Sequence, residues 1–416
     1  MSGLSPNASS PPFSSPPGRD ERKTAGPGAT CPAPGLQRQV LNRQVLQRQP
    51  DGSVKITGFD LASQILRGRN LKQAGFNADM VARLPQKNTS ILFKDGEDHR
   101  RQRSAVARFF APAVVAGRYR SLMSDLSLRL VQKLVADKRA TLDDMSLDLS
   151  VAVAAEITGL TESLLPGIGH RLSRFFTNEI PAKANWWDIL VFVLTSQVNL
   201  FLVYFLDVRP AMKARKRAPR EDLLSHLVAQ KWSVIDILTE CITYSTAGMS
   251  TTREFIILAA WHLLEREDLR RRFLDADEAG RHALLEEILR LEPAVGTLLR
   301  RATQKVTLDN DGIREEIAAG TLLEIDVREV NADPKTAGRC PYHIDPGRAQ
   351  GRPPAHMSFG DGPHKCPGAA VAIQETAIFL DHLLRVPNLR LARAPGVSWN
   401  KTTAGYVLRG AIITAE

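Results

Sequence analysis

Residues 359–368 read Phe359-Gly360-Asp361-Gly362-Pro363-His364-Lys365-Cys366-Pro367-Gly368, and an apolar stretch of helical character follows from about Ala369. The loop is rich in glycine and proline and holds a lone cysteine. Glycines allow backbone N–H groups to approach the sulfur, and the N-terminal dipole of the following helix favours a thiolate. A thiolate releases electron density strongly to haem iron, so Cys366 is a candidate axial ligand. The alternative is a buried structural cysteine, and the loop alone does not separate the two.

A second motif upstream is Glu287-Ile288-Leu289-Arg290. Residues three apart lie on one face of a helix, so the carboxylate of Glu287 and the guanidinium of Arg290 can meet. Arg290 can also donate to distant backbone through its fork of N–H groups. Alone this motif is weak, because solvated Glu/Arg pairs at this spacing are common.

A third motif, Ala247-Gly248-Met249-Ser250-Thr251-Thr252, lies inside an otherwise helical run from about Val234 to Arg266. Two small residues followed by hydroxyls are unfavourable in the middle of a helix. We therefore expect either that something flat approaches the backbone there or that the helix is locally opened.

In this order the three motifs resemble those of the cytochrome P450 family, and the resemblance extends from about Pro50 to Ala415. It implies a mainly α fold with a minor β-sheet part. It also implies a single haem-thiolate domain, placed here at residues 36–416, that binds haem b with Cys366 as the ligand of the iron.

The resemblance assigns further residues to the site. Arg348 would complete a structural triad with Glu287 and Arg290. The two haem propionates need several cationic or N–H donors if they are to be buried. The positions that match propionate partners are His99, Arg103, Arg300, His356 and His364, and those that match other haem contacts are Ala247, Gly248, Phe359, Gly360 and Gly368.

Thr251 matches the family's proton-relay threonine, and the catalytic pair is predicted to be Thr251 with Ser250. The residue before this threonine is usually Asp or Glu in the family, and a serine can pass a proton but cannot store one near neutral pH. Glu254, one turn later, is either a substitute acid or an exposed, solvated carboxylate. The missing acid keeps a P450-like peroxygenase, isomerase or dehydratase open as an alternative.

The favoured function is a haem-thiolate monooxygenase that hydroxylates or epoxidises its substrate with dioxygen. The sequence shows no flavin or iron–sulfur signature, so electrons would come from a separate ferredoxin or flavodoxin-type donor with its reductase. A competing class is a non-catalytic haem protein that senses gas or carries electrons. Thr251 argues against it, since a pure electron carrier would use a second axial ligand. The lack of paired Cys/His ligands excludes a zinc module.

The chain has 416 residues and a net charge of +10. Acidic residues are interspersed among the basic ones and no recognition motif accompanies them, so nucleic-acid binding is not expected. By resemblance, the basic side chains near the cysteine face would steer an acidic electron donor. They are Arg100, Arg101, Arg108 and Lys365.

Residues 1–35 are mostly Pro, Ser, Gly and Ala, and we expect them to be disordered because they cannot bury enough apolar surface. They show no positive segment followed by a hydrophobic one, so no signal peptide or N-terminal anchor is predicted. We expect a cytoplasmic protein.

An apolar segment from Trp186 to Leu206 is nearly long enough to span a bilayer, but Ser196, Gln197 and Asn199 interrupt its centre. By position in the family it is the lid region, and the alternative is a core-packing helix pair. We predict a lid that touches a membrane surface, with tryptophans and cations at the interface. It favours a bulky lipophilic substrate such as a terpenoid, carotenoid, steroid or fatty acid. The cations follow the segment and are Arg209, Lys213, Arg215, Lys216 and Arg217.

Overall fold

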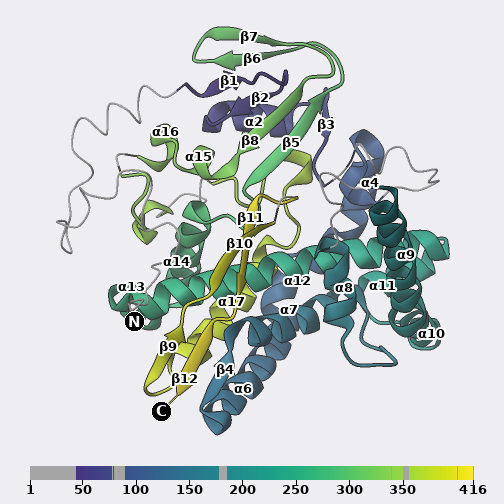
Figure 1. The fold of residues 1–416 in the computed structure, drawn as a ribbon, viewed down its shortest axis with the longest axis vertical. Helices are drawn as coiled ribbons and strands as arrows, with labels where there is room; N and C mark the ends of the chain where they lie inside the picture. Colours follow the sequence, from purple (N-terminus) through teal and green to yellow (C-terminus); the bar gives the residue numbers. More distant parts are fainter. Residues whose placement is uncertain are drawn as a thin grey trace.

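The computed structural model describes residues 44–76, 78, 90–177, 185–338, 340–349, 356–400 and 402–415. The predicted disordered tail, residues 1–35, lies outside these ranges. Within them the chain forms a mainly helical body with small sheets, which confirms the predicted fold class (Figure 1).

The largest sheet has five short strands in the order β1-β2-β8-β5-β3. β2 and β8 run parallel, and the other neighbouring pairs run antiparallel. Helix α2 (Phe59–Arg67) shares a core with this sheet, because Leu61, Ile65 and Leu66 are buried in one cluster with strand residues. The strands are β1 (Leu46–Arg48), β2 (Val54–Ile56), β3 (Leu71–Gln73), β5 (Thr297–Ala302) and β8 (Leu322–Asp326).

A hairpin joins β6 (Val306–Asn310) to β7 (Ile313–Ile317), as the Asp-Gly step predicts. Asp311 and Gly312 both have positive φ, at 54° and 84°. Two consecutive residues in this region are what a two-residue hairpin turn requires.

Helix α12 (Val234–Glu265) runs through the middle of the helical body (Figure 1). It begins where the Ser233 hydroxyl accepts the Asp236 N–H, and it packs against α7 (Leu142–Thr158) and α17 (Ala369–Leu384). Its second half is buried on all sides from Phe255 to Leu263, as expected of a helix that is apolar all round. The helix is continuous across residues 247–252, so it is not locally opened there.

The remaining helices surround this centre. They are α4 (Gly96–Ala107), α5 (Pro112–Val114), α6 (Arg120–Asp137), α8 (Ile168–Thr177), α9 (Trp186–Val203), α10 (Arg209–Arg217), α11 (Leu223–Ala229), α13 (Glu267–Asp275), α14 (Glu278–Leu291), α15 (Val327–Asn331) and α16 (Pro334–Ala337).

The C-terminal strands divide between two sheets. β10 (Gly396–Asn400) pairs with β11 (Gly405–Arg409), whereas β12 (Ile412–Ala415) pairs with β9 (Leu389–Arg393) and β4 (Arg139–Thr141). Residues 400–414 therefore contribute to two separate sheets. Tyr406 is buried, with its ring 4.5 Å from that of Trp399.

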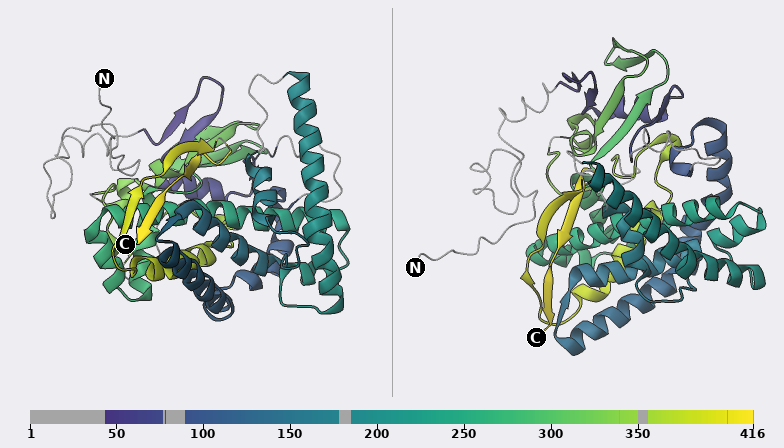
Figure 2. Two further views of the ribbon diagram at one scale, coloured as in Figure 1. Left: turned by 60° about the horizontal axis from the view of Figure 1, so that its bottom comes forward. Right: turned by 45° about the vertical axis from the view of Figure 1, so that its right-hand side comes forward.

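Helix α9 continues through a π-helical segment, Tyr204–Val208, into α10. The first part of α9 projects from the body of the protein (Figure 2). Of α9's own residues, Asn199 and Val203 are the buried ones. The core-packing alternative is therefore wrong for residues 186–198, whereas the part of the segment from Asn199 onward packs against the protein. The lid that touches a membrane stays a prediction.

Candidate active site

The cysteine loop is held in a fixed shape by its own backbone. The Cys366 N–H donates to the Phe359 carbonyl over 2.8 Å, and the Gly360 N–H donates to the Met357 carbonyl over 2.8 Å. Gly362 has φ of 65°, and a side chain there would lie 2.4 Å from the Leu66 carbonyl oxygen. This position therefore requires glycine.

Asp361 fixes the loop to helix α2. Its carboxylate accepts from the Ser63 hydroxyl at 2.9 Å, from Arg67 Nε at 2.8 Å and from the Gly362 N–H at 2.7 Å. These bonds lower the pKa of Asp361. The sequence interpretation missed this anchor, because Arg67 lies almost 300 residues upstream.

Cys366 lies three residues before α17, and part of the residue is exposed to solvent. Loss of solvation raises the pKa of Cys366, while the N–H groups of Gly368 and Ala369 and the charge of Arg103 act in the opposite direction. These N–H donors lie where the cysteine loop joins α17, which is where the glycine pattern predicts them. They would stabilise the thiolate form of Cys366 when it is the ligand of a metal ion.

Helix α12 exposes its backbone toward the same region at Ala247 and Gly248, which carry little or no side chain. We call these two residues the bare segment of α12. Ala247 and Gly248 are exposed although their neighbours Thr246 and Met249 are buried. Gly248 and Gly368 line one cavity between α7, α12 and α17. The Thr251 hydroxyl donates to the Ala247 carbonyl over 2.8 Å, which holds it at the edge of the bare segment.

Two histidines and two arginines gather beside the cysteine loop. The rings of His99 and His364 lie 4.1 Å apart, and Arg103 donates to the Lys365 carbonyl. Burial is the main cause that lowers the pKa of His99 to about 4, and the charges of His364, Arg103 and Arg300 act in the same direction.

The carboxylate of Asp95 faces this group of four, which we call the cationic cluster and define as His99, Arg103, Arg300 and His364. Asp95 Oδ1 lies 3.0 Å from His364 Nε2. Arg300 is buried, and its loss of solvation lowers its pKa to about 10. Among the described residues, the cluster sets two guanidinium groups and two imidazoles beside the carboxylate of Asp95, so it can donate to two further anionic groups and fits the propionates of a haem.

His356 lies beside the cysteine loop. Its ring is 6.0 Å from that of Phe359. Burial lowers its pKa to about 4, and the charges of Arg290, Glu287 and Lys365 act on it as well. Its role as a propionate partner stays a prediction.

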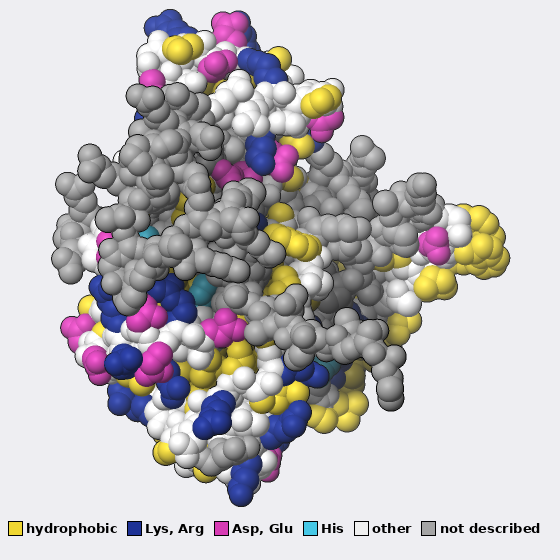
Figure 3. Space-filling model, turned by 60° about the vertical axis from the view of Figure 1, so that its left-hand side comes forward, with side chains coloured by type: hydrophobic (Ala, Val, Ile, Leu, Met, Phe, Trp, Pro, Cys, Tyr) yellow, Lys and Arg dark blue, Asp and Glu magenta, His cyan; other side chains and the backbone are white. Residues whose placement is uncertain are grey.

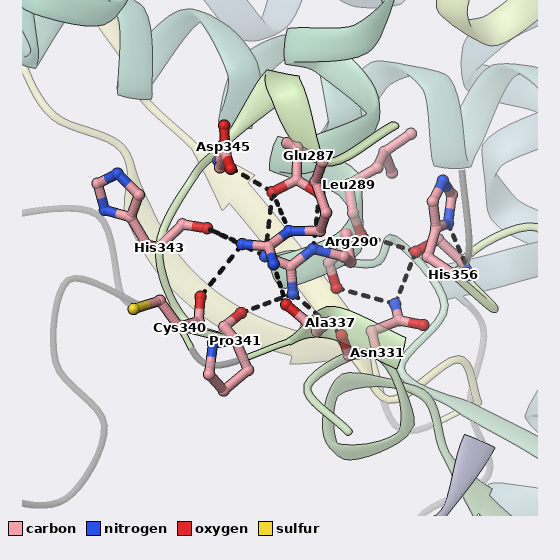
Figure 4. A network of polar contacts seen from close by, with 12 residues as sticks. Glu287, Leu289, Arg290, Asn331, Ala337, Cys340, Pro341, His343, Asp345 and His356 are labelled. Atoms are coloured by element: carbon pink, nitrogen blue, oxygen red, sulfur yellow. Dashed lines mark hydrogen bonds and ion pairs between the residues drawn. The ribbon is translucent and has the colours of Figure 1, made fainter. Parts of the chain in front are cut away.

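The predicted triad residues meet in one buried network (Figure 4). Glu287 accepts from Arg290 Nε at 2.8 Å and from Arg348 Nε at 3.2 Å. Arg290 also donates to the carbonyls of Asn331 and Pro341, over 3.0 and 2.6 Å. The network joins α14 to the chain that leads toward the cysteine loop.

Glu254 is not a solvated carboxylate. It is half-buried, and it accepts from Arg409 Nη1 at 2.6 Å and from the Leu408 N–H at 2.8 Å. The turn of α12 that carries it faces β11, which the sequence spacing does not reveal. The expectation of an exposed carboxylate is therefore wrong, and these contacts give no support to the substitute acid.

A different carboxylate lies against the bare segment of α12. Glu375, on α17, is buried and lines the cavity with Gly248 and Thr252. Burial raises its pKa to about 8, and the Ser150 hydroxyl acts against that shift. An acidic residue within an apolar helix is the signal that could have identified it.

Comparison with known proteins agrees with this geometry. The sequence profile described as "Cytochrome P450" matches residues 282–402. The chain is 28% identical over 360 residues to the biotin biosynthesis cytochrome P450 of Bacillus subtilis (strain 168), covering 81% of this chain and 84% of the relative. It is 26% identical over 322 residues to a methyl-branched lipid omega-hydroxylase of Mycobacterium bovis (strain ATCC BAA-935 / AF2122/97), covering 74% and 70%.

Solved structures share the fold. P450BioI, in complex with an acyl carrier protein ligated to hexadec-9Z-enoic acid, superposes with a TM-score of 0.72 at 21% identity, covering 92% of this chain and 98% of that one. A Bacillus megaterium cytochrome P450 in complex with corticosterone gives 0.71 at 20% identity, covering 92% and 97%.

The chain belongs to the cytochrome P450 family. It is accordingly a member of a monooxygenase family whose cofactor is a haem held by a thiolate. In this P450, Cys366 stands at the position that the resemblance assigns to the thiolate, and it would hold the haem together with the cationic cluster and the bare Ala247–Gly248 backbone. The bound haem would supply dioxygen binding and its reductive activation.

This P450 departs from the family pattern at the proton relay. Ser250 stands before Thr251, and the nearest carboxylate on the following turn, Glu254, is engaged with Arg409. The two hydroxyls can hold and pass a proton, but neither supplies an acid near neutral pH.

Proposed function

We propose that the protein is a haem b monooxygenase that hydroxylates or epoxidises a bulky lipophilic small molecule. The observation that carries this proposal is the position of Cys366 two residues before Gly368, which lines one cavity with Gly248 of the bare segment of α12. Dioxygen is the co-substrate, and Thr251, with Ser250 beside it, holds the proton-donating hydroxyl.

A lipophilic substrate is supported by the names of relatives. One is a methyl-branched lipid omega-hydroxylase, and solved neighbours bind a fatty acyl carrier protein and a steroid. Fatty acyl chains and steroids are therefore the substrate classes to test first, followed by terpenoids and carotenoids.

Electrons would come from a separate ferredoxin or flavodoxin-type donor with its reductase. The basic side chains predicted to steer it are exposed, namely Arg100, Arg101, Arg108 and Lys365. Arg101 is partly compensated by Asp98 at 2.6 Å, and Arg108 contacts His226 Nδ1 at 3.1 Å. An exposed surface of this kind would raise the association rate and its salt sensitivity more than the affinity. We place the enzyme in the cytoplasm.

A titration of the haem-loaded protein with fatty acids and steroids tests the substrate class. A true substrate should displace water from the haem and shift its absorption spectrum, and it should be oxidised when dioxygen, reductase and donor are present. Polar compounds that shift the spectrum and turn over, while lipophilic ones do neither, would overturn the proposed class.

A peroxide-driven or rearranging reaction is the second candidate, and the engaged state of Glu254 favours it. Without a carboxylate at the relay, proton supply for dioxygen activation is weak. Turnover that proceeds with peroxide, or with no oxidant, and that is independent of dioxygen and reductase would establish this alternative over the first.

A further inference from the structure

The first half of α9, residues 186–198, is apolar and exposed on all sides. Its apolar side chains form the yellow projection at the right of Figure 3. With 3.6 residues per turn, the side chains of Trp187, Val191, Leu194 and Val198 share one face, and those of Ile189 and Val193 lie on the opposite face. The exposed fractions are 57, 56, 55 and 58% on the first face and 47 and 45% on the second. We call residues 186–198 the free half of α9.

The free half carries no charged side chain after Asp188, and the next charge along the helix is Asp207. The helix from Trp186 to Arg217 is long and apolar enough to cross a membrane by length and composition. Thirteen free residues reach about 20 Å, however, which is less than the ~30 Å of a bilayer's hydrocarbon core. The free half can therefore enter one leaflet but cannot span the bilayer while α9 stays packed below it.

A buried polar network fixes the base of this helix. Arg171 on α8 donates to both oxygens of Asp207, over 2.8 and 2.6 Å, and Asn199 Nδ2 donates to the Arg171 carbonyl over 3.0 Å. Breaking a buried, paired network is strongly unfavourable. The free half is therefore held away from the protein and is not free to fold back onto it.

The exposure of opposite faces decides which partner suits the free half. A second copy of the chain or another protein covers one face of a helix and would leave the other apolar face in water. Lipid surrounds a helix on all sides and removes both faces from water. A contiguous apolar surface of this kind therefore fits a bilayer better than a protein groove.

The end of the free half suits the headgroup region. The rings of Trp186 and Trp187 lie 3.6 Å apart, and tryptophan prefers the membrane–water interface. Asn185 and Asp188 form a capping box, with bonds of 2.9 and 3.0 Å, which satisfies polar groups at the start of the helix. Because this end is the one farthest from the body of the protein, a shallow angle of entry is needed to keep its polar groups near headgroup depth.

The cations expected at this interface lie elsewhere. Arg209, the first of them, is 22 residues from Trp187, which is about 33 Å along the helix. Arg215 is buried in an ion pair with Asp222. At physiological salt, charges are screened beyond ~8 Å, so α10 cannot attract lipid headgroups at the free half. The prediction of tryptophans and cations together at the interface is therefore wrong for the cations.

We propose that the free half of α9 binds a lipid bilayer by inserting obliquely into one leaflet, through apolar contact and without a requirement for anionic lipid. The association is reversible, because the inserted segment is short and the body of the protein remains in water. This surface is independent of the haem reaction.

Flotation of the haem-loaded protein with phosphatidylcholine vesicles tests the proposal. The wild-type protein should float with neutral vesicles, and adding phosphatidylserine should change binding little. The triple variant Val191→Ser, Leu194→Ser and Val198→Ser should bind at least about tenfold more weakly. A matched control replaces three equally exposed apolar residues in other elements, Val135→Ser, Ile235→Ser and Ile313→Ser, and should float like the wild type.

Three outcomes would overturn the proposal. One is a wild-type protein that stays with the unbound fraction, and another is a triple variant that floats like the control. The third is light scattering that shows a dimer lost in the triple variant, which would assign the free half to a second copy of the chain. If the triple variant does not fold, quenching of tryptophan fluorescence by brominated phosphatidylcholine decides the question, since Trp187→Phe should reduce it.

Discussion

Glu254 Oε1 lies 2.6 Å from Arg409 Nη1, which ties the central helix α12 to strand β11 near the C-terminus. The same carboxylate accepts the Leu408 N–H over 2.8 Å. A carboxylate that accepts from two donors on another element has a structural role, because it holds the two elements together. We therefore expect the relay predicted at Thr251 to depend on hydroxyl groups, and this expectation has a measurable consequence.

Thr251→Ala should keep substrate binding but divert reducing equivalents into hydrogen peroxide, because the hydroxyl that positions a proton is lost. Ser250→Asp should have the opposite effect and raise the fraction of electrons recovered in product, since it supplies an acid. The measurement is product and peroxide formed per NAD(P)H consumed. Unchanged coupling in both variants would mean that protons reach the site by another route.

Glu287→Ala should yield apoprotein or aggregate, because it leaves Arg290 and Arg348 without their carboxylate. Removing one partner of a buried ion pair costs about 3–5 kcal/mol. Glu278→Ala is the matched control: its pair with Arg120 is exposed, and such pairs contribute about 0–1 kcal/mol. Thermal unfolding and haem content report both variants, and a stable, haem-loaded Glu287→Ala protein would refute a structural role for the triad.

Arg300→Gln should weaken haem retention, because hydrogen bonds to charged groups contribute about 1.5–3 kcal/mol. That range corresponds to a haem affinity about ten- to a hundredfold lower. Arg301→Gln is the neighbouring control, since its Nη1 donates to the Gly320 carbonyl on the exposed side of the sheet. Transfer of haem to apomyoglobin measures the difference, and equal rates for the two variants would remove Arg300 from the propionate site.

Glu375 should make the stability of the protein depend on pH. Its folded pKa is raised from 4.5 to about 8, so the folded state binds a proton that the unfolded state has already lost between these values. Stability should therefore fall as pH rises from about 4.5 to 8, by up to about 1.4 kcal/mol per pH unit from this group. Glu375→Gln, which keeps the shape and cannot ionise, should show a smaller slope in urea unfolding across this window. Identical slopes would mean that Glu375 is not protonated in the folded protein.

Local sequence patterns predicted the parts of the site that local spacing determines. The three-residue spacing of Glu287 and Arg290 placed them on one face of α14, and the glycine pattern around Cys366 anticipated N–H groups near the sulfur. The β6–β7 turn is likewise determined locally, because Asp311 and Gly312 both adopt the positive φ that a two-residue hairpin turn requires.

Contacts between distant segments could not be predicted in this way. Asp361 pairs with Arg67, and Glu254 pairs with Arg409, across separations of 294 and 155 residues. Burial of Glu375 likewise depends on how α7, α12 and α17 pack. The exposure of α9 could not be predicted from its composition either, because an apolar sequence is typical both of a core helix and of a helix that contacts a membrane.

The absorption spectrum of the reduced carbon monoxide complex tests most directly whether Cys366 is the thiolate ligand of the haem iron. With Cys366 as ligand, the wild-type protein should show the strongly red-shifted Soret band of a haem-thiolate, and Cys366→His should lose that band while it can still bind haem. A wild-type protein that stays colourless after haem supplementation, or a carbonyl complex with the Soret band of a histidine-ligated haem, would contradict the account.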